Sequence, residues 1–192
     1  MPRSTPSADT ILDTALDLAE SCGWERLYLH DVAEALDCDL AAIARHYRQK
    51  DDLVEAWLDR ADAALFERAR GVDLAALNAS KRLEELLMAW LGGIAAHRAL
   101  TGQMLLYKLE LGHVHLQVGA LLRVSRTVQW WREAARRHNL HLARVAEESL
   151  LSAVFLRTFV HWLRHPEVAD ADLRALLRRQ LRGSPLTWLL RA

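Results

Sequence analysis

Apolar residues recur three and four positions apart along most of the chain, which is the spacing of one face of an α-helix. Ile11, Ala15, Leu18 and Ala19 form the first such stripe, and residues 53–65 repeat it. Residues that interrupt helices are scarce, since the 192 residues include only 8 glycines and 4 prolines. Because 52% of the residues are hydrophobic and can supply a core, the sequence predicts an all-α fold.

Capping residues and helix breakers divide this pattern into about nine helices. We expect them over residues 7–22, 30–36, 40–46, 50–70, 80–97, 100–111, 113–138, 142–164 and 170–182. The short second and third helices are joined by a tight turn, where Asp39 is placed to cap the third helix. Such a pair is typical of a helix-turn-helix, whose second helix enters the major groove of DNA. We therefore expect a helix-turn-helix head over residues 1–52 and a helical body over residues 53–192.

The charge of the chain is unevenly distributed, although the formal net charge is zero. Residues 1–50 carry five Lys or Arg and nine Asp or Glu, which gives −4, and the remainder carries +4. Duplex DNA is normally bound by a positive surface. An acidic head therefore predicts weak or narrowly selective DNA binding.

Several other classes of protein are disfavoured by the sequence. The first ten residues form no apolar leader, and the longest central stretch without charge or histidine, residues 86–96, is about half a membrane span. We therefore expect a cytoplasmic protein that does not enter a membrane. Cys22 and Cys38 suggest neither a disulfide nor a metal site, and the spaced pair His161 and His165 lacks the glutamate of a zinc motif. No phosphate loop or nucleophile elbow is present, so we expect no enzyme, no metal and no cofactor.

The segment GWERLYLHDVAEALDCDLAAIARHYRQKDDLVEAW, which begins at Gly23, resembles the signature of the TetR family of transcriptional regulators without a gap. Gly23-Trp24 matches the end of the first helix, Asp31-Val32-Ala33 the core of the second, and Tyr47 the aromatic residue that closes the third. Lys50, Asp51 and Leu53 match the start of the fourth helix. The resemblance covers about residues 10–58.

This resemblance implies a homodimeric regulator, most often a repressor, whose third helices enter successive major grooves of operator DNA. A ligand bound in the helical body would change the separation of the two heads. Tyr47 would fill the core of the head. The positions that would contact DNA are Arg3, His30, Leu40, Ala42, Ile43, Ala44, Arg45, His46 and Lys50.

The head also departs from the family pattern. Asp37 stands at the turn where glycine is usual, and residues 27–29 lack the usual Ser or Thr cap. Leu40-Ala41-Ala42 replaces Lys-Gly-Thr, and Ala44 replaces a tyrosine. The alternative is a lipid- or isoprenoid-binding protein of the ubiquinone-biosynthesis type, which shares the TetR fold, has lost DNA binding and carries a similar Gly-Trp pair.

The body holds most of the aromatic residues, which either line a ligand pocket or pack the core. The pocket candidates are Trp90, His97, Gln103, Met104, Tyr107, Trp130, Trp131, Phe155 and Phe159. Because this lining is chiefly apolar, we expect a hydrophobic or amphipathic small-molecule effector.

The eighth helix is apolar on more than one face, and the ninth has one leucine face, so both suit a two-fold dimer interface. The candidates are Val145, Leu150, Ala153, Leu156, Val160, Leu163, Leu173, Leu176, Leu177 and Leu181. The alternative is a monomer that covers the eighth helix with its own seventh helix and its C-terminal tail.

Overall fold

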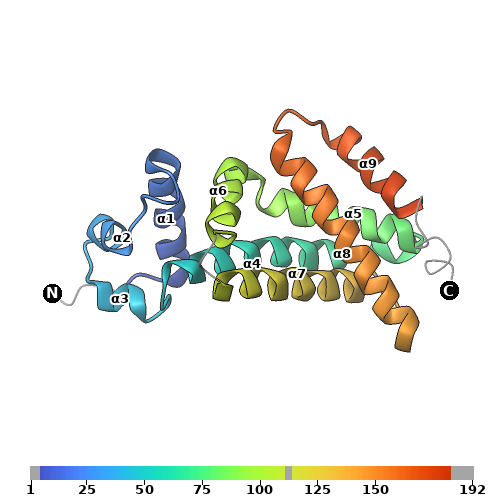
Figure 1. The fold of residues 1–192 in the computed structure, drawn as a ribbon, viewed down its shortest axis with the longest axis horizontal. Helices are drawn as coiled ribbons and strands as arrows, with labels where there is room; N and C mark the ends of the chain where they lie inside the picture. The colour runs from blue at the N-terminus through green and yellow to red at the C-terminus, as the bar shows by residue number, and fades with distance from the viewer. Residues whose placement is uncertain (1–4, 111–113, 183–192) are drawn as a thin grey trace. The chain divides into compact units, whose positions relative to one another are not determined.

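The computed structural model describes residues 5–110 and 114–182 (Figure 1). Within these ranges the chain forms nine α-helices and two short 3₁₀ helices, and no strand. The all-α prediction is therefore confirmed. The helices group into two compact units, a first unit in residues 1–60 and 97–117 and a second unit in residues 61–96 and 118–192. The division at residues 52 and 53 stays a prediction.

The first unit contains the N-terminal helices and a helix from the middle of the chain. Its elements are α1 (Ala8–Cys22), α2 (Leu29–Ala35), α3 (Leu40–Ala44), the first half of α4 (Lys50–Ala69), α6 (Arg98–Lys108) and the start of α7 (Val114–Ala134). Helix α2 packs on both α1 and α3, and α6 packs on α1. Ile11, Leu16, Val32, Ile43 and Leu53 are almost completely buried in this unit.

Local capping explains where α1 begins and ends. The Ser7 hydroxyl accepts the backbone N–H of Thr10, which satisfies a free donor of the first turn. The helix ends at Gly23, whose φ of 85° is costly for other residues and whose N–H donates to Ala19. Trp24 then turns into the core, and its backbone N–H donates to Oε1 of Gln103 on α6 at 2.8 Å.

The second unit is a separate helical bundle. It contains the rest of α4, η1 (Val72–Ala76), α5 (Ala79–Gly93), most of α7, α8 (His141–Arg164) and α9 (Asp170–Arg182), and the short η2 (Ala95–His97) follows α5. Helix α9 packs on both α5 and α8 (Figure 1). Asn78 caps α5 by accepting the N–H of Lys81, so this helix begins one residue before the expected residue 80.

Two buried ion clusters tie the second unit together. Asp62 of α4 accepts hydrogen bonds from Nε1 of Trp90 at 2.7 Å and from a guanidinium nitrogen of Arg123 at 2.8 Å. Glu147 of α8 has no exposed surface and accepts from the Nε atoms of Arg132 and Arg137. Such carboxylates are stable inside a protein only with cationic or hydrogen-bonding partners. The first cluster therefore links α4, α5 and α7, and the second links α8 to the end of α7.

The described residues contain neither a membrane-spanning helix nor a metal-binding cluster. None of the helices is both long and apolar enough to span a membrane. No group of three or more His, Cys, Asp or Glu side chains has the geometry to hold a metal ion in the described ranges.

Candidate nucleic-acid interface

The turn between α2 and α3 has the geometry of a helix-turn-helix. Asp37 adopts a left-handed conformation with a φ of 48°, which the sequence had suggested for this position. The N–H of Asp37 donates to Glu34, and the N–H of Cys38 donates to Ala33 at 2.9 Å. These two bonds satisfy carbonyls at the end of α2. Aspartate tolerates this conformation better than most residues other than glycine, so the turn forms despite the substitution.

Helix α3 has one buried and one exposed face. The Asp39 carboxylate accepts the N–H of Ala42 at 2.8 Å, as expected for the helix cap. Ala42 and Ile43 are buried, so their prediction as DNA-contacting residues is wrong. Their side chains fill the core of the first unit, because they lie on the face of α3 that packs inward. Tyr47 is also buried, and its hydroxyl donates to the carbonyl of Ala8 at 2.9 Å.

The exposed face of α3 carries the remaining candidates. Leu40, Ala41, Ala44, Arg45 and His46 all point to solvent. Leu40 is 52% exposed, so a large apolar side chain stands at the start of this face.

Arg45 and His30, which were both predicted to contact DNA, lie near the ends of the short helices. A guanidinium nitrogen of Arg45 donates to the hydroxyl of Thr5 at 3.2 Å, so the segment before α1 lies against α3. His30 is exposed and stacks on Tyr28, with ring centroids 5.3 Å apart. Thr5 and Tyr28 were not among the predicted contact residues. Arg3 lies outside the described residues.

Lys50, which was expected to contact DNA, is half-buried and binds backbone carbonyls of the first unit. Its ammonium donates to the carbonyl of Trp24 at 2.5 Å and to that of Glu25 at 3.1 Å. It also lies about 5 Å from the ring centroids of Trp24 and Tyr107. Burial lowers the pKa of Lys50. The lysine therefore holds the residues after α1 against α4, and the basic group is occupied inside the protein.

A different arginine faces solvent at the start of α4. The Asp52 carboxylate accepts the backbone N–H groups of Arg48, at 2.7 Å, and of Gln49. This caps α4 and leaves the exposed side chain of Arg48 close in sequence to Arg45 and His46. Glu34, Asp37 and Asp39 are exposed as well, so the surface around α3 is mixed in charge.

Helix α6 is fixed to α4 inside the first unit. The Lys108 side chain is 2% exposed, and its ammonium donates to Asp51 at 2.8 Å and to Glu55 at 2.7 Å. Nε1 of Trp57 donates to the hydroxyl of Thr101 at 2.9 Å. Asp51 is therefore largely buried against Lys108.

A crystal structure of a TetR transcriptional regulator from Nitrosomonas europaea is similar to this chain. The two are 40% identical over 94% of this chain and 98% of the other, with a TM-score of 0.81. The chain belongs to the TetR family of transcriptional regulators. The helix-turn-helix described above is therefore that of a transcriptional regulator, and DNA binding follows from the family.

A second solved structure is less similar. A regulatory protein of the TetR family from Rhodococcus RHA1 is 19% identical over 96% of this chain and 95% of the other, with a TM-score of 0.47. No protein-family model matches the chain, and no curated protein matches it.

The residues predicted to line a ligand pocket do not share one environment in this TetR-family chain. His97, Gln103, Met104 and Tyr107 belong to the first unit, where His97 binds Glu20. Trp90, Trp131, Phe155 and Phe159 are buried in the second unit, and Trp130 is half exposed against Phe66. Nε1 of Trp131 donates to the carbonyl of Leu83. The prediction missed that several of these side chains are already used by packing and hydrogen bonds.

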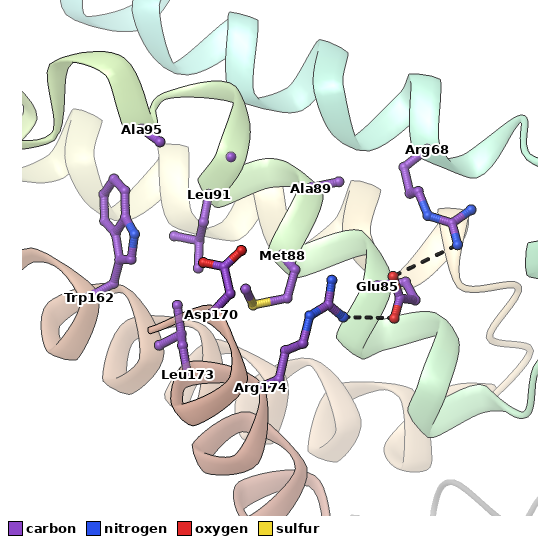
Figure 2. Close-up of a pocket in the computed structure, with 11 residues that line it drawn as sticks. Arg68, Glu85, Met88, Ala89, Leu91, Ala95, Trp162, Asp170, Leu173 and Arg174 are labelled. Atoms are coloured by element: carbon purple, nitrogen blue, oxygen red, sulfur yellow. Dashed lines mark hydrogen bonds and ion pairs between the residues drawn. The ribbon is translucent and has the colours of Figure 1, made fainter. Parts of the chain in front are cut away.

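A pocket of about 320 Å³ lies elsewhere in the second unit, where α5 meets α9 and the end of α8 (Figure 2). None of the predicted pocket residues lines it. Its apolar wall comes from Met88, Leu91, Trp162 and Leu173. Its polar residues are Arg68, Glu85, Asp170 and Arg174, and Arg174 donates to Glu85 at 2.7 Å. The remaining lining residues, Ala89, Gly92 and Ala95, are small.

The predicted dimer residues also separate into two groups. Leu173, Leu177 and Leu181 are buried within the second unit, so their prediction as interface residues is wrong. They form the inner face of α9, which packs on α5 and α8. The other predicted residues keep some or most of their surface: Val145, Leu150, Ala153, Leu156, Val160, Leu163 and Leu176.

Proposed function

We propose that this TetR-family regulator binds operator DNA as a homodimer through the exposed face of α3 and acts as a repressor controlled by a small amphipathic molecule. It would act in the cytoplasm and would catalyse no reaction. The exposed face of α3 is the observation that carries the proposal. It presents Arg45 and His46 to solvent beside the apolar Leu40, while Tyr47 and Ile43 hold the helix in place from behind. A helix held in this way can enter a groove about 12 Å wide.

Selection of bound sequences from random duplex DNA tests this proposal. We expect enrichment of a palindromic site, because a two-fold dimer presents the same helix to each half. In gel shifts on that site, Arg45→Ala should weaken binding and reduce the salt dependence by about 0.9 per lost phosphate contact in each half-site. Arg70→Ala is the matched control, since Arg70 is exposed in the second unit directly after α4 and pairs with Glu67 of that helix.

Two outcomes would reject DNA binding through α3. Failure to enrich any sequence at low salt, together with a lipid or quinone that copurifies in native mass spectrometry, would favour the lipid-binding alternative. Equal binding by the Arg45→Ala and Arg70→Ala variants would leave a regulator that reads DNA through another surface.

The homodimer is supported by an exposed apolar stripe on α8. Leu142, Val145, Leu156 and Val160 are each at least 40% exposed and lie on α8 at helical spacing. Isolated exposed apolar residues are common, but two exposed apolar pairs on one face of a helix suit an interaction surface, although Ser149 and Ser152 lie between the pairs. A second copy of the chain fits it, because a two-fold axis pairs the stripe with itself.

Analytical ultracentrifugation tests this interface. Val145→Glu should shift the protein from dimer to monomer, because the interface would bury a charge without a partner. Val72→Glu makes the same change at a valine that is 93% exposed on η1, and it should leave the dimer intact. A monomeric parent protein would refute the proposal directly, as would a Val145→Glu variant that remains dimeric.

The pocket between α5, α8 and α9 supports an amphipathic effector. Its walls combine an indole and aliphatic side chains with carboxylates and guanidinium groups, as Figure 2 shows for Trp162, Asp170 and Arg174. A ligand with an apolar body and one polar end would satisfy both parts. A volume of about 320 Å³ limits the effector to a small molecule. In a reporter assay with the selected operator, a pool of small amphiphiles should raise expression in the parent and fail in Leu91→Trp, which fills the pocket.

A further inference from the structure

The exposed face of α3 begins with three side chains that have no hydrogen-bonding group. Leu40 is 52% exposed, and Ala41 and Ala44 also lie on the solvent side. The buried face, with Ala42 and Ile43, accounts for the packing of this helix without them. The apolar character of the exposed face is therefore not required by the core, and it needs a different physical reason.

The floor of the major groove offers one apolar group. Each base pair presents hydrogen-bond donors and acceptors there, and thymine alone adds a methyl group. Leucine and alanine side chains cannot pair with the donors and acceptors, but they can remove a methyl group from water. The residues at the N-terminal end of a recognition helix are the ones that reach base edges. In this chain Leu40 and Ala41 hold those positions.

The charges around the start of α3 also favour bases over phosphates at this end. The Asp39 carboxylate is used to cap Ala42, and Asp37 is exposed one turn earlier. Two carboxylates repel the phosphate backbone, so contacts near Leu40 are more favourable on the groove floor. The basic side chains of Arg45 and Arg48 follow the other end of α3, where they are exposed and can contact phosphates.

We propose that this regulator reads its operator through thymine methyl groups, with Leu40 as the principal specificity-determining residue and Ala41 and Ala44 beside it. The inference rests on the proposed binding of DNA through α3. It adds the chemistry of recognition, which is apolar contact in place of hydrogen bonds to base edges. Each half-site should then contain at least one thymine whose methyl group is required.

Replacement of thymine by deoxyuracil tests the inference, because it removes the methyl group and leaves base pairing unchanged. Fluorescence anisotropy would measure the Kd for the selected operator and for duplexes with one thymine replaced at a time. Loss of one contacted methyl should weaken binding about fourfold, and loss in both half-sites about sixteenfold. Thymines outside the contacted positions should show no change.

Variants of α3 then assign the contact. Leu40→Ala should bind the thymine and deoxyuracil operators with nearly equal affinity at the affected position, because the side chain that contacts the methyl is shortened. Arg45→Ala should keep the fourfold preference for thymine while its salt dependence falls. Leu40 is exposed, so its replacement should leave the thermal melting curve unchanged, which circular dichroism would verify.

The outcomes separate the inference from the function on which it rests. If no thymine in the operator responds to deoxyuracil while Arg45→Ala weakens binding, the methyl-reading inference is wrong and DNA binding through α3 stands. If a thymine responds equally in the parent and in Leu40→Ala, another residue reads it and the assignment to Leu40 is wrong. If selection recovers no operator, the proposed function itself fails.

Discussion

Replacement of Glu147 by glutamine should destabilise the second unit more than any other single change of charge on α8. Its carboxylate is fully buried and accepts from Nε of Arg132 at 2.9 Å and from Nε of Arg137 at 2.7 Å. Both arginine side chains are also nearly buried, with 4% and 6% exposed. Glu147→Gln keeps the size of the side chain but removes the buried negative charge that both arginines share. It also turns an N–H donor toward one of the guanidinium groups.

The expected loss in the free energy of unfolding comes from leaving a buried charge without its partner, which costs about 3–5 kcal/mol. We expect a value near 3 kcal/mol, because Arg132 also contacts Glu133 and the carbonyl of Asn139. That is a large fraction of the roughly 5–15 kcal/mol by which a typical domain is stable. The variant should therefore fold but unfold at a clearly lower urea concentration.

The neighbouring glutamate provides the matched control. Glu148 pairs with Arg144 at 2.8 Å, but the Arg144 side chain is 51% exposed. Exposed pairs of this kind contribute about 0–1 kcal/mol, so Glu148→Gln should be nearly neutral. Urea unfolding of both variants and the parent, at one protein concentration because the chain is proposed to dimerise, would give the free energies of unfolding. Equal losses for Glu147→Gln and Glu148→Gln would refute the argument that burial sets the cost.

Three further variants test other contacts. Tyr47→Phe should cost about 1 kcal/mol through the bond to Ala8. Burial raises the pKa of Tyr47, so its hydroxyl adds stability below about pH 10 that is lost as pH rises through the raised pKa. The melting temperature of Tyr47→Phe should therefore fall less than that of the parent at alkaline pH. Gly92→Ala should raise the melting temperature through about 0.5–1 kcal/mol, since nothing lies within 4 Å of the added Cβ. Lys108→Met should cost about 3 kcal/mol and speed hydrogen exchange in α6, because Asp51 loses its ammonium partner; unchanged exchange would contradict this.

The local features of the first unit could be predicted from the sequence because their causes are local. Ser7 and Asp39 cap the helices that they precede, and Asp37 takes the left-handed conformation at the turn. Each of these depends on residues within four positions in the chain. Such features can be predicted from the sequence, because each cap or turn is formed by residues within about one helical turn of each other.

The contacts that join distant parts of the sequence could not be predicted in the same way. Lys108 and Asp51 are 57 positions apart, and nothing in either local pattern marks them as a buried pair. Lys50 has the pattern of a phosphate contact, but the carbonyl of Trp24 captures its ammonium. A charged residue on a helix looks solvated in a sequence until its partner across the fold is known. The pocket could not be predicted for a related reason. Its walls include small residues and paired charges from several helices, and nothing in the sequence marks these residues as neighbours.

The two faces of α3 explain why this regulator can have a typical fold and an unusual reading surface together. Ile43 and Tyr47 hold the helix from inside, and changes to them would disturb the core of the first unit. Leu40 and Ala44 contribute little to that core, so their replacement changes what the helix can contact at little cost in stability. Specificity can therefore vary on the exposed face while the buried face keeps the fold. The exposed face of α3 is apolar at its start, and Arg45 and Arg48 follow it. Recognition should then depend more on contact with bases than on charge, which predicts an operator affinity that changes only weakly with salt.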